Sequence, residues 1–271
     1  MKARLLMALA IAAFALISYY GNPGDENQIT GETERVAFNE EADEMKLGLQ
    51  AAPQMVQQHG GQTRDLVAQQ RVQKIGVELL RALQEKIEAE GRAIPYQFSF
   101  TLLADAKTVN AFALPGGPVF ITEALYRRLE QQSDAELAGV IGHEIGHVIE
   151  RHGNKRMAKQ KLFSGLATAG GVAGGDAQSQ QAAAMIANMV SMKYGREDEL
   201  ESDKWGVKLM AWAGYDPRAM IGVMKVLDEA GAGGGPPEML STHPKPANRI
   251  EYIQQVIKSE FPGGLPPGLR L

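Results

Sequence analysis

The chain begins with an apolar run that has no amphipathic period. Leu5–Ile17 contains no polar residue, and the positive charges of Lys2 and Arg4 precede it. A basic start followed by a short apolar run is typical of a secretory signal, whereas a full membrane span prefers about 20 apolar residues. We therefore expect residues 1–20 to be a signal peptide or an uncleaved signal-anchor. Because acidic residues follow the run, the remainder is expected outside the cytoplasm.

The pattern divides the rest of the chain into a tether, a folded domain and a tail. Residues 21–39 are polar and acidic, which predicts a tether. Residues 40–258 carry the amphipathic segments and predict one domain, and the Pro- and Gly-rich residues 259–271 predict a flexible tail. Most of these segments have helical periodicity and few alternate as strands do, so the predicted fold class is α+β, mostly helical with a small β-sheet.

Individual elements follow from apolar spacing and from turn residues. The predicted helices cover residues 40–58, either whole or divided by Pro53, then 65–90, 123–130, a stretch that begins at Ser133, 179–194, 197–212, 217–230 and 248–258. The predicted strands are 96–102, where apolar and polar residues alternate, and 119–122. The predicted loops are 110–117, the segment 165–175 with its five glycines, and 231–237.

The amino-acid composition limits the kinds of functional site that the chain can contain. Hydrophobic residues make up 44% of the chain, which allows a sizeable core, and the net charge of −4 gives no reason to expect a nucleic-acid partner. The chain contains no cysteine, which excludes disulfides, thiolate metal sites and cysteine nucleophiles. A metal would therefore be held by His, Asp or Glu, and three of the five histidines lie within ten residues of one another.

These histidines include an HExxH motif, His143-Glu144-Ile145-Gly146-His147. It lies on the helix that Ser133 and Glu136 cap as a capping box. Residues at i and i+4 of a helix are about 40° apart, so both imidazoles project from one face and can bind one Zn²⁺. Glu144 lies between them, where it can reach a metal-bound water as general base.

A third metal ligand is expected from the acidic cluster 197–203, because a catalytic zinc takes three protein ligands and keeps one position open. On a helix, Glu199 and Asp203 share a face, while Glu201 points about 160° away. One face can thus supply a ligand and a carboxylate that supports it. A solvated, acidic helix start explains the same spacing equally well.

The two motifs together, HExxH and then Glu199-Leu200-Glu201-Ser202-Asp203, resemble the HExxH plus ExxxD pattern of the HtpX-like and CAAX-prenyl-protease-like zinc metallopeptidases, most of all the periplasmic BepA and LoiP type. Segments elsewhere in the chain also resemble that family: Asn110–Gly117, Arg151-His152, Ala213–Pro217, Ser241–Pro244 and Arg249. The resemblance covers roughly residues 40–253. It implies a zincin-like metalloprotease domain with its small β-sheet beside the active-site helix.

The resemblance also implies the roles of single residues. His143, His147 and Glu199 would hold Zn²⁺, Glu144 would be the catalytic base, and Asp203 would support a ligand. In such proteases the peptide substrate lies extended along a sheet edge, and this suggests a role for the strand 119–122, which can also be an ordinary core strand.

Three further residues are assigned roles in or around the predicted zinc site. His243 follows the loop 231–237 and is expected near the zinc, where it would either occupy the open position as a plug, as the resemblance suggests, or stabilise the oxyanion; a histidine without a role also fits. Arg249 is a second candidate for the oxyanion. His152 falls on the apolar side of the helix and is expected to be packed, hydrogen-bonded and structural.

The leading hypothesis is a zinc-dependent metalloendopeptidase that hydrolyses polypeptides, including misfolded envelope proteins, in envelope protein quality control. We expect the enzyme to be exported, either periplasmic or membrane-anchored through its N-terminal segment. The alternative is a membrane-associated chaperone or assembly factor with an auto-inhibited protease site. A purely structural zinc module is disfavoured, because such a site needs no base like Glu144 and keeps no open position.

Overall fold

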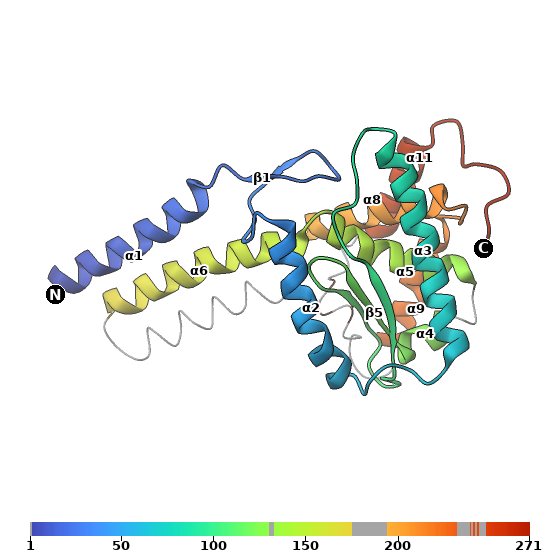
Figure 1. Cartoon of the computed structure of the whole chain (residues 1–271), viewed down its shortest axis with the longest axis horizontal. Coiled ribbons are helices and arrows are strands. Elements are labelled where there is room, and N and C mark those ends of the chain that lie inside the picture. Colours follow the sequence, from blue (N-terminus) through green and yellow to red (C-terminus); the bar gives the residue numbers. More distant parts are fainter. Residues whose placement is uncertain are drawn as a thin grey trace.

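Two long helices run side by side away from the rest of the molecule in the computed structural model (Figure 1). The structure describes residues 2–129, 133–174, 194–231, 239, 241, 243 and 248–271. Its helices are α1 (Lys2–Tyr20), α2 (Glu41–Gln58), α3 (Leu66–Glu88), α4 (Glu123–Leu129), α5 (Asp134–Ile149), α6 (His152–Gly174), α8 (Arg196–Trp212), α9 (Ala219–Gly231) and α11 (Arg249–Glu260). Its strands are β1 (Asp25–Glu26), β2 (Thr33–Glu34), β3 (Ser99–Leu103), β4 (Ala111–Ala113) and β5 (Pro118–Thr122).

This architecture confirms the α+β class, mostly helical with a small sheet. The long predicted helix 65–90 is α3, and the side chain of its N-cap, Asp65, accepts a hydrogen bond from Ala68 N. Residues 40–58 form a single helix, α2, in spite of Pro53. The predicted helix 179–194 lies outside the described residues except for Tyr194, and the predicted loop 231–237 does so except for Gly231, the last residue of α9.

The three-stranded sheet has the order β3-β5-β4, with β3 parallel and β4 antiparallel to β5. The loop predicted at 110–117 is therefore wrong at its start, since it contains β4. A three-residue strand, Ala-Phe-Ala, is too short to show an alternating pattern. The expectation that the strand 119–122 lies at a sheet edge is also wrong, because β5 is the buried central strand. The edge strands are β3 and β4.

Only one of these edges is left open by its neighbours. Along β3, the Gln69 side chain of α3 donates to Phe100 O (2.9 Å) and accepts from Leu102 N (2.8 Å). Thr63 N adds a further bond, to Leu102 O. Among the described residues, no strand pairs with the second edge of β4. In the described part of the chain the open edge of the sheet thus lies at β4, which packs beside α5.

Helices α5 and α8 approach each other backbone to backbone in the centre of the body. A Cβ atom added at Gly142 would lie 3.2 Å from Gly206 Cα, and one added at Gly146 would lie 2.9 Å from Ser202 Cα. Larger side chains at these four positions would hold the two helices apart. The small residues therefore bring the HExxH helix against the helix that carries the acidic cluster.

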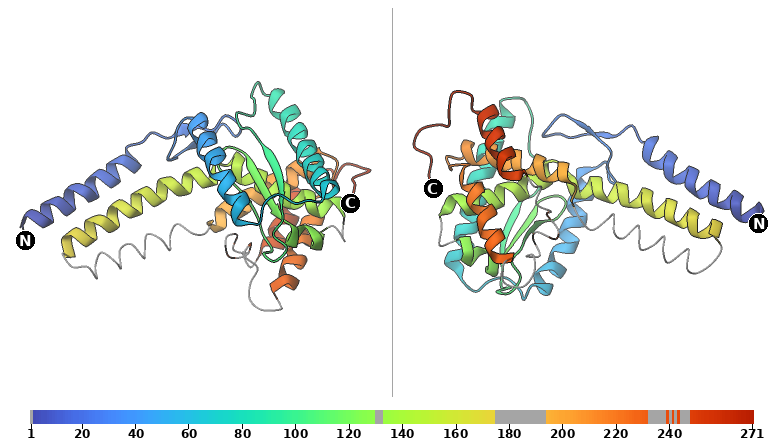
Figure 2. Two further views of the ribbon diagram at one scale, coloured as in Figure 1. Left: turned by 60° about the horizontal axis from the view of Figure 1, so that its bottom comes forward. Right: turned by 180° about the vertical axis from the view of Figure 1, so that it is seen from behind.

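Helix α6 runs from His152 to Gly174 without interruption, so the break predicted at 165–175 is wrong over its described part. Glycine lowers helix propensity, but tertiary packing overrides this preference. A Cβ atom at Gly165 would lie 2.7 Å from the Cβ of Ala15, which shows how closely α1 packs there. The glycine makes room for the antiparallel contact between α1 and α6 that both views display (Figures 1 and 2).

The segments expected as a tether and a tail both contact the body. Residues 21–39 contain the hairpin of β1 and β2, and Asn27 donates to Ile149 O at the end of α5 (2.7 Å). In the tail, Arg270 N donates to Gly214 O (2.9 Å) and its guanidinium donates to Glu78 (2.9 Å). Isolated long-range hydrogen bonds of this kind leave no periodic signal in a sequence.

Candidate metal centre

The HExxH residues lie on the buried face of a helix that begins where the capping motif predicts. The Ser133 side chain accepts from Ala135 N, and its hydroxyl donates to the Glu136 carboxylate. His143 and His147 are each only 2% exposed, and Glu144 is fully buried. Polar side chains are rarely buried so completely without partners, so the neighbours of these three decide what the site can do.

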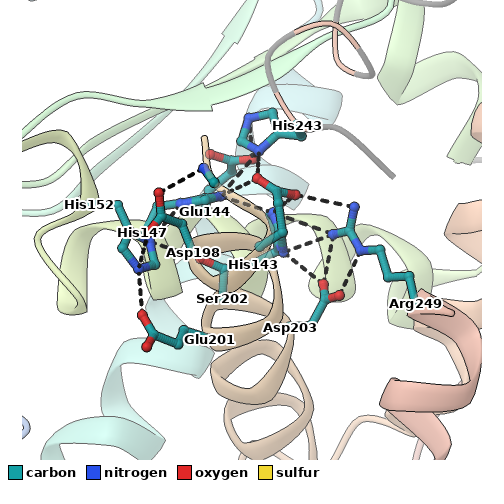
Figure 3. Close-up of polar contacts among 12 residues, drawn as sticks. His143, Glu144, His147, His152, Asp198, Glu201, Ser202, Asp203, His243 and Arg249 are labelled. Carbon is teal, nitrogen blue, oxygen red and sulfur yellow. Dashed lines mark hydrogen bonds and ion pairs between the residues drawn. The ribbon is translucent and has the colours of Figure 1, made fainter. Parts of the chain in front are cut away.

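Helix α8 supplies two acidic side chains to the same place, Glu199 and Asp203, of which Asp203 is labelled in Figure 3. Glu199 lies 3.5 Å from the Nε2 atoms of both His143 and His147, and these two Nε2 atoms are 3.0 Å apart. Asp203, one turn further along, lies 2.9 Å from the other ring nitrogen of His143. Glu199 and Asp203 therefore share the face of α8 that meets α5, as their spacing predicts.

The donor atoms of His143, His147 and Glu199 fit a zinc ion. Zinc–ligand bonds of about 2.0 Å in a tetrahedral arrangement separate two ligand atoms by about 3.3 Å, close to the distances above. Glu199 Oε2 is buried, and its nearest charged or polar partners among the described residues are His143 Nε2 at 3.5 Å and Arg249 Nη1 at 3.3 Å. Burial raises the pKa of Glu199, but hydrogen bonds from His143, His147 and His243 outweigh it and hold that pKa well below its usual value. The carboxylate is therefore ionised, as a metal ligand must be.

Asp203 and Arg249 hold the outer side of His143. Two Arg249 nitrogens bind Asp203 in a forked pair, Nε to Oδ2 at 2.6 Å and Nη2 to Oδ1 at 2.7 Å. Arg249 Nη1 also lies 3.3 Å from Glu199 Oε2. Burial and the Arg249 charge lower the pKa of His143, but hydrogen bonds to Asp203 and Glu199 outweigh them and raise it to about 9. The guanidinium therefore contacts both carboxylates, and its Nη2 also lies 3.1 Å from His143 Nδ1.

His243 reaches the same centre from the C-terminal part of the chain. Its Nδ1 lies 3.0 Å from Glu199 Oε1 and 3.1 Å from His147 Nε2. The residue is 1% exposed. His143, His147, Glu199 and His243 each offer a donor atom, and all four atoms lie within 4.8 Å of one another. The site therefore brings together four potential ligands. The sequence predicts three of them as ligands and leaves the role of the fourth, His243, open.

Glu144 lies beside the centre on α5. Within the described part of the chain neither of its carboxylate oxygens has a hydrogen-bond partner, and His243 Nε2 is 3.8 Å from Oε1. Burial raises the pKa of Glu144. A desolvated carboxylate with a raised pKa beside a candidate metal site is a stronger base than an exposed one and suits the role of a proton acceptor.

Two side chains near the site were not assigned to it from the sequence. The Tyr194 ring stacks on His147, with ring centroids 4.0 Å apart. Glu201, which the helix phase turns away from the metal site, binds His152 Nε2 at 2.9 Å. His152 is packed and hydrogen-bonded as expected, and its Nδ1 lies 2.9 Å from His147 Nδ1. Spacing on a single helix could not reveal either contact, because each joins different elements.

The free edge of the sheet runs close to these residues. Backbone bonds at Asn110 and Leu114 face β5, so the alternation of an antiparallel ladder turns the N–H and C=O groups of Ala111 and Ala113 the other way. Ala113 lines the same small pocket as His147. Among the residues that the structure describes, a stretch of backbone without a strand partner thus lies beside the two histidines of the HExxH motif.

A buried HExxH helix that meets an acidic helix beside a free strand edge is the arrangement of a metalloprotease domain. The chain belongs to peptidase family M48, whose family model matches residues 68–257. Among known proteins, it is 31% identical over 183 residues to the beta-barrel assembly-enhancing protease of Escherichia coli K12, which covers 63% of this chain and 37% of that protein. It is 34% identical over 154 residues to the mitochondrial metalloendopeptidase OMA1 of Arabidopsis thaliana, covering 57% of this chain and 30% of that protein.

A third relative is the metalloprotease LoiP of E. coli K12, 28% identical over 159 residues, with 57% of this chain and 61% of that protein covered. The chain therefore spans only part of these relatives, about two fifths of the beta-barrel assembly-enhancing proteases. The family and the class of metalloproteases, and with them the resemblance drawn from the two motifs, are confirmed.

Proposed function

We propose that this protein is a zinc-dependent metalloendopeptidase, with His143, His147 and Glu199 as the zinc ligands. The observation that carries the proposal is the convergence of three buried donor atoms on one point, beside the Glu144 carboxylate, which accepts no hydrogen bond from any residue that the structure describes. A structural zinc site would need no such base. The family implies a metal, and the two imidazoles with one carboxylate form a ligand set typical of catalytic zinc.

When bound, zinc polarises the scissile carbonyl and acidifies water. Glu144 then acts as the general base: it accepts a proton from the attacking water and returns one to the leaving amine. Asp203 accepts the Nδ1 proton of His143, which leaves Nε2 free to face the metal. Arg249 holds Asp203 in place through its two hydrogen bonds, and we assign it this role in preference to oxyanion stabilisation.

For the substrate, we infer a polypeptide that pairs in extended form with β4. The outward N–H and C=O groups of Ala111 and Ala113 provide main-chain hydrogen bonds without selecting a sequence. Such recognition suits unfolded or misfolded chains, which can extend along an edge where a folded protein cannot. Main-chain pairing would place the scissile bond beside His147, because Ala113 and His147 line one pocket.

We further propose that His243 closes the site as a plug. Its Nδ1 lies within hydrogen-bond distance of both Glu199 and His147, so it competes for the position that water would take. The plug makes a protease that is inactive at rest and active once the His243 segment is displaced. This arrangement retains one feature of the chaperone alternative, the auto-inhibited site, within a protease.

For the location, we propose an envelope protease that α1 anchors to a membrane. By length and composition α1 can cross a membrane: an 18-residue window has a mean hydropathy of 1.8, and 11% of that window is buried. A signal sequence passes the same test, but the close contact of Ala15 with Gly165 favours a retained helix. The relatives named as beta-barrel assembly-enhancing proteases support a role in envelope protein quality control.

The proposal is tested with the full chain in detergent or liposomes, by measuring bound zinc and the cleavage of an unfolded polypeptide such as casein. We expect about one zinc per chain, activity that a chelator removes and zinc restores, and loss of metal in His143→Ala and His147→Ala. Mass spectrometry of the N-terminus after expression tests whether α1 is retained. Full metal content in both histidine variants would refute the site, and chelator-resistant cleavage would refute the mechanism.

A further inference from the structure

The outer nitrogen of His147 has an unusual partner. While His143 Nδ1 meets the buried Asp203 carboxylate, His147 Nδ1 meets the Nδ1 of another imidazole, that of His152, at 2.9 Å (Figure 3). The second nitrogen of His152, Nε2, lies 2.9 Å from Glu201 Oε2. The His152 ring is 1% exposed, so both of its nitrogens depend on these contacts.

If His147 binds zinc through Nε2, one arrangement of protons satisfies this series of hydrogen bonds from His147 through His152 to Glu201. The ligand nitrogen must be unprotonated, so the proton of His147 lies on Nδ1. That N–H then donates to His152 Nδ1, which must carry a lone pair. The proton of His152 therefore lies on Nε2 and donates to the Glu201 carboxylate. The Glu201 carboxylate is the last acceptor, so it fixes the positions of the protons on both His152 and His147.

We propose that His152 and Glu201 form a positioning pair that fixes the tautomer and the ring orientation of His147 for zinc binding. The proposal rests on the zinc site proposed above and adds to it two residues that touch neither metal nor substrate. Hydrogen-bond partners behind a metal ligand typically change metal affinity by about 10- to 100-fold.

The other groups around His152 do not replace Glu201. Ser202 Oγ lies 3.3 Å from Nδ1, the nitrogen that already accepts from His147. Asp198 Oδ1 is 3.9 Å from Nε2, beyond hydrogen-bond distance. Tyr194 stacks on the His147 face and limits its tilt, but it cannot select a tautomer. Of the described residues, Glu201 alone lies within hydrogen-bond distance of Nε2 as an acceptor.

Glu201 also makes the proposal testable, because its side chain is 48% exposed. A surface glutamate can be replaced without creating a cavity, whereas His152→Ala removes a fully buried ring. Glu201→Ala deletes the acceptor. Glu201→Gln keeps an amide oxygen in its place and should restore the hydrogen bond. Glu197, exposed on the same helix, provides a matched control, since Glu197→Ala removes the same charge nearby.

The experiment measures the zinc Kd of the full chain by competition with a chromophoric chelator. We expect Kd to rise about 10- to 100-fold in His152→Ala and on the order of tenfold in Glu201→Ala. Glu201→Gln and Glu197→Ala should stay within about threefold of wild type. Because Glu201 acts through His152, the double variant His152→Ala/Glu201→Ala should bind no more weakly than His152→Ala alone.

A second readout is the tautomer itself, measured by ¹⁵N NMR of histidine-labelled, zinc-loaded protein. We expect the Nε2–H form of His152 in wild type and Glu201→Gln, and a mixture of tautomers in Glu201→Ala. The pair is refuted if Glu201→Ala binds zinc as wild type does and keeps one tautomer, while Glu199→Ala loses the metal. Retention of zinc by Glu199→Ala would instead refute the proposed ligand set, and the positioning pair with it.

Discussion

Gly146 on α5 and Ser202 on α8 lie so close that a Cβ atom on the glycine would come within 2.9 Å of the serine Cα. This contact sets the separation between the helix that carries both histidines and the helix that carries Glu199. A shift of the helices by a fraction of an ångström would move the carboxylate out of ligand distance. The geometry of the metal centre is therefore decided by small residues that bear no metal-binding group.

Gly146→Ala tests this dependence. We expect the free energy of unfolding to fall by roughly 1–3 kcal/mol, because the clash with the α8 backbone outweighs the gain in helix propensity. Zinc affinity should fall as well. Urea denaturation and chelator competition measure the two effects. Gly170→Ala on α6 is the control, because a new Cβ there meets no atom of the described residues within 4 Å, and it should stabilise by about 0.5–1 kcal/mol.

Glu144→Gln should separate catalysis from metal binding. The variant keeps the shape of the side chain but cannot accept a proton, so kcat should fall by several orders of magnitude. The zinc content should remain near one per chain, because Glu144 is not among the proposed ligands. Metal analysis and peptide hydrolysis on the same preparation decide the matter. Turnover comparable to wild type would exclude Glu144 as the base.

Three of the five acidic residues of α8, Glu199, Asp203 and Glu201, should differ in how strongly their removal weakens zinc binding. Glu199→Ala removes a ligand and should lose zinc almost completely, whereas Asp203→Ala removes the partner of His143 and should weaken binding by about 10- to 100-fold. Glu201→Ala acts through two imidazoles and should have the smallest effect. Titration with a zinc chelator gives the order. A larger loss in Glu201→Ala than in Glu199→Ala would contradict the assignment of the ligand.

His243→Ala distinguishes the plug from an oxyanion role. Removal of a plug opens the fourth position and should raise proteolysis of an unfolded substrate several-fold. Loss of an oxyanion donor would instead lower kcat by about 10²–10³-fold. Initial rates measured at one zinc per chain give the sign. Rates equal to wild type would show that His243 does neither.

The metal-free protein should lose stability as the pH rises, through His143. Hydrogen bonds to Asp203 and Glu199 raise the folded-state pKa of His143 to about 9, against an ordinary value of 6.5. The protonated ring therefore stabilises the fold below about pH 6.5, by on the order of 3 kcal/mol, and this contribution disappears as the pH passes 9. Denaturation of chelator-treated wild type and His143→Gln from pH 6 to 10 should show the difference between them shrinking. A constant difference would contradict the raised pKa.

Some features of this protein could be predicted from the sequence, because each of them depends on the geometry within a single helix. The spacing of His143 and His147 places both on one face, and the same rule separates Glu199 and Asp203 from Glu201. The Ser133 capping motif likewise involves neighbours in the chain, and the structure begins α5 at the next residue. Such features need no information about distant partners, so their residue pattern is sufficient.

Only the tertiary structure decided how these elements meet. The glycines of 165–175 favour a loop locally, yet α6 continues because Gly165 packs against Ala15. Likewise β4 is too short to predict, and its pairing puts β5 in the centre of the sheet and leaves the β4 edge free. The contact of His152 with both His147 and Glu201 joins three elements of the chain. Long-range packing and hydrogen bonding determine these features, and neither is encoded in the spacing of nearby residues.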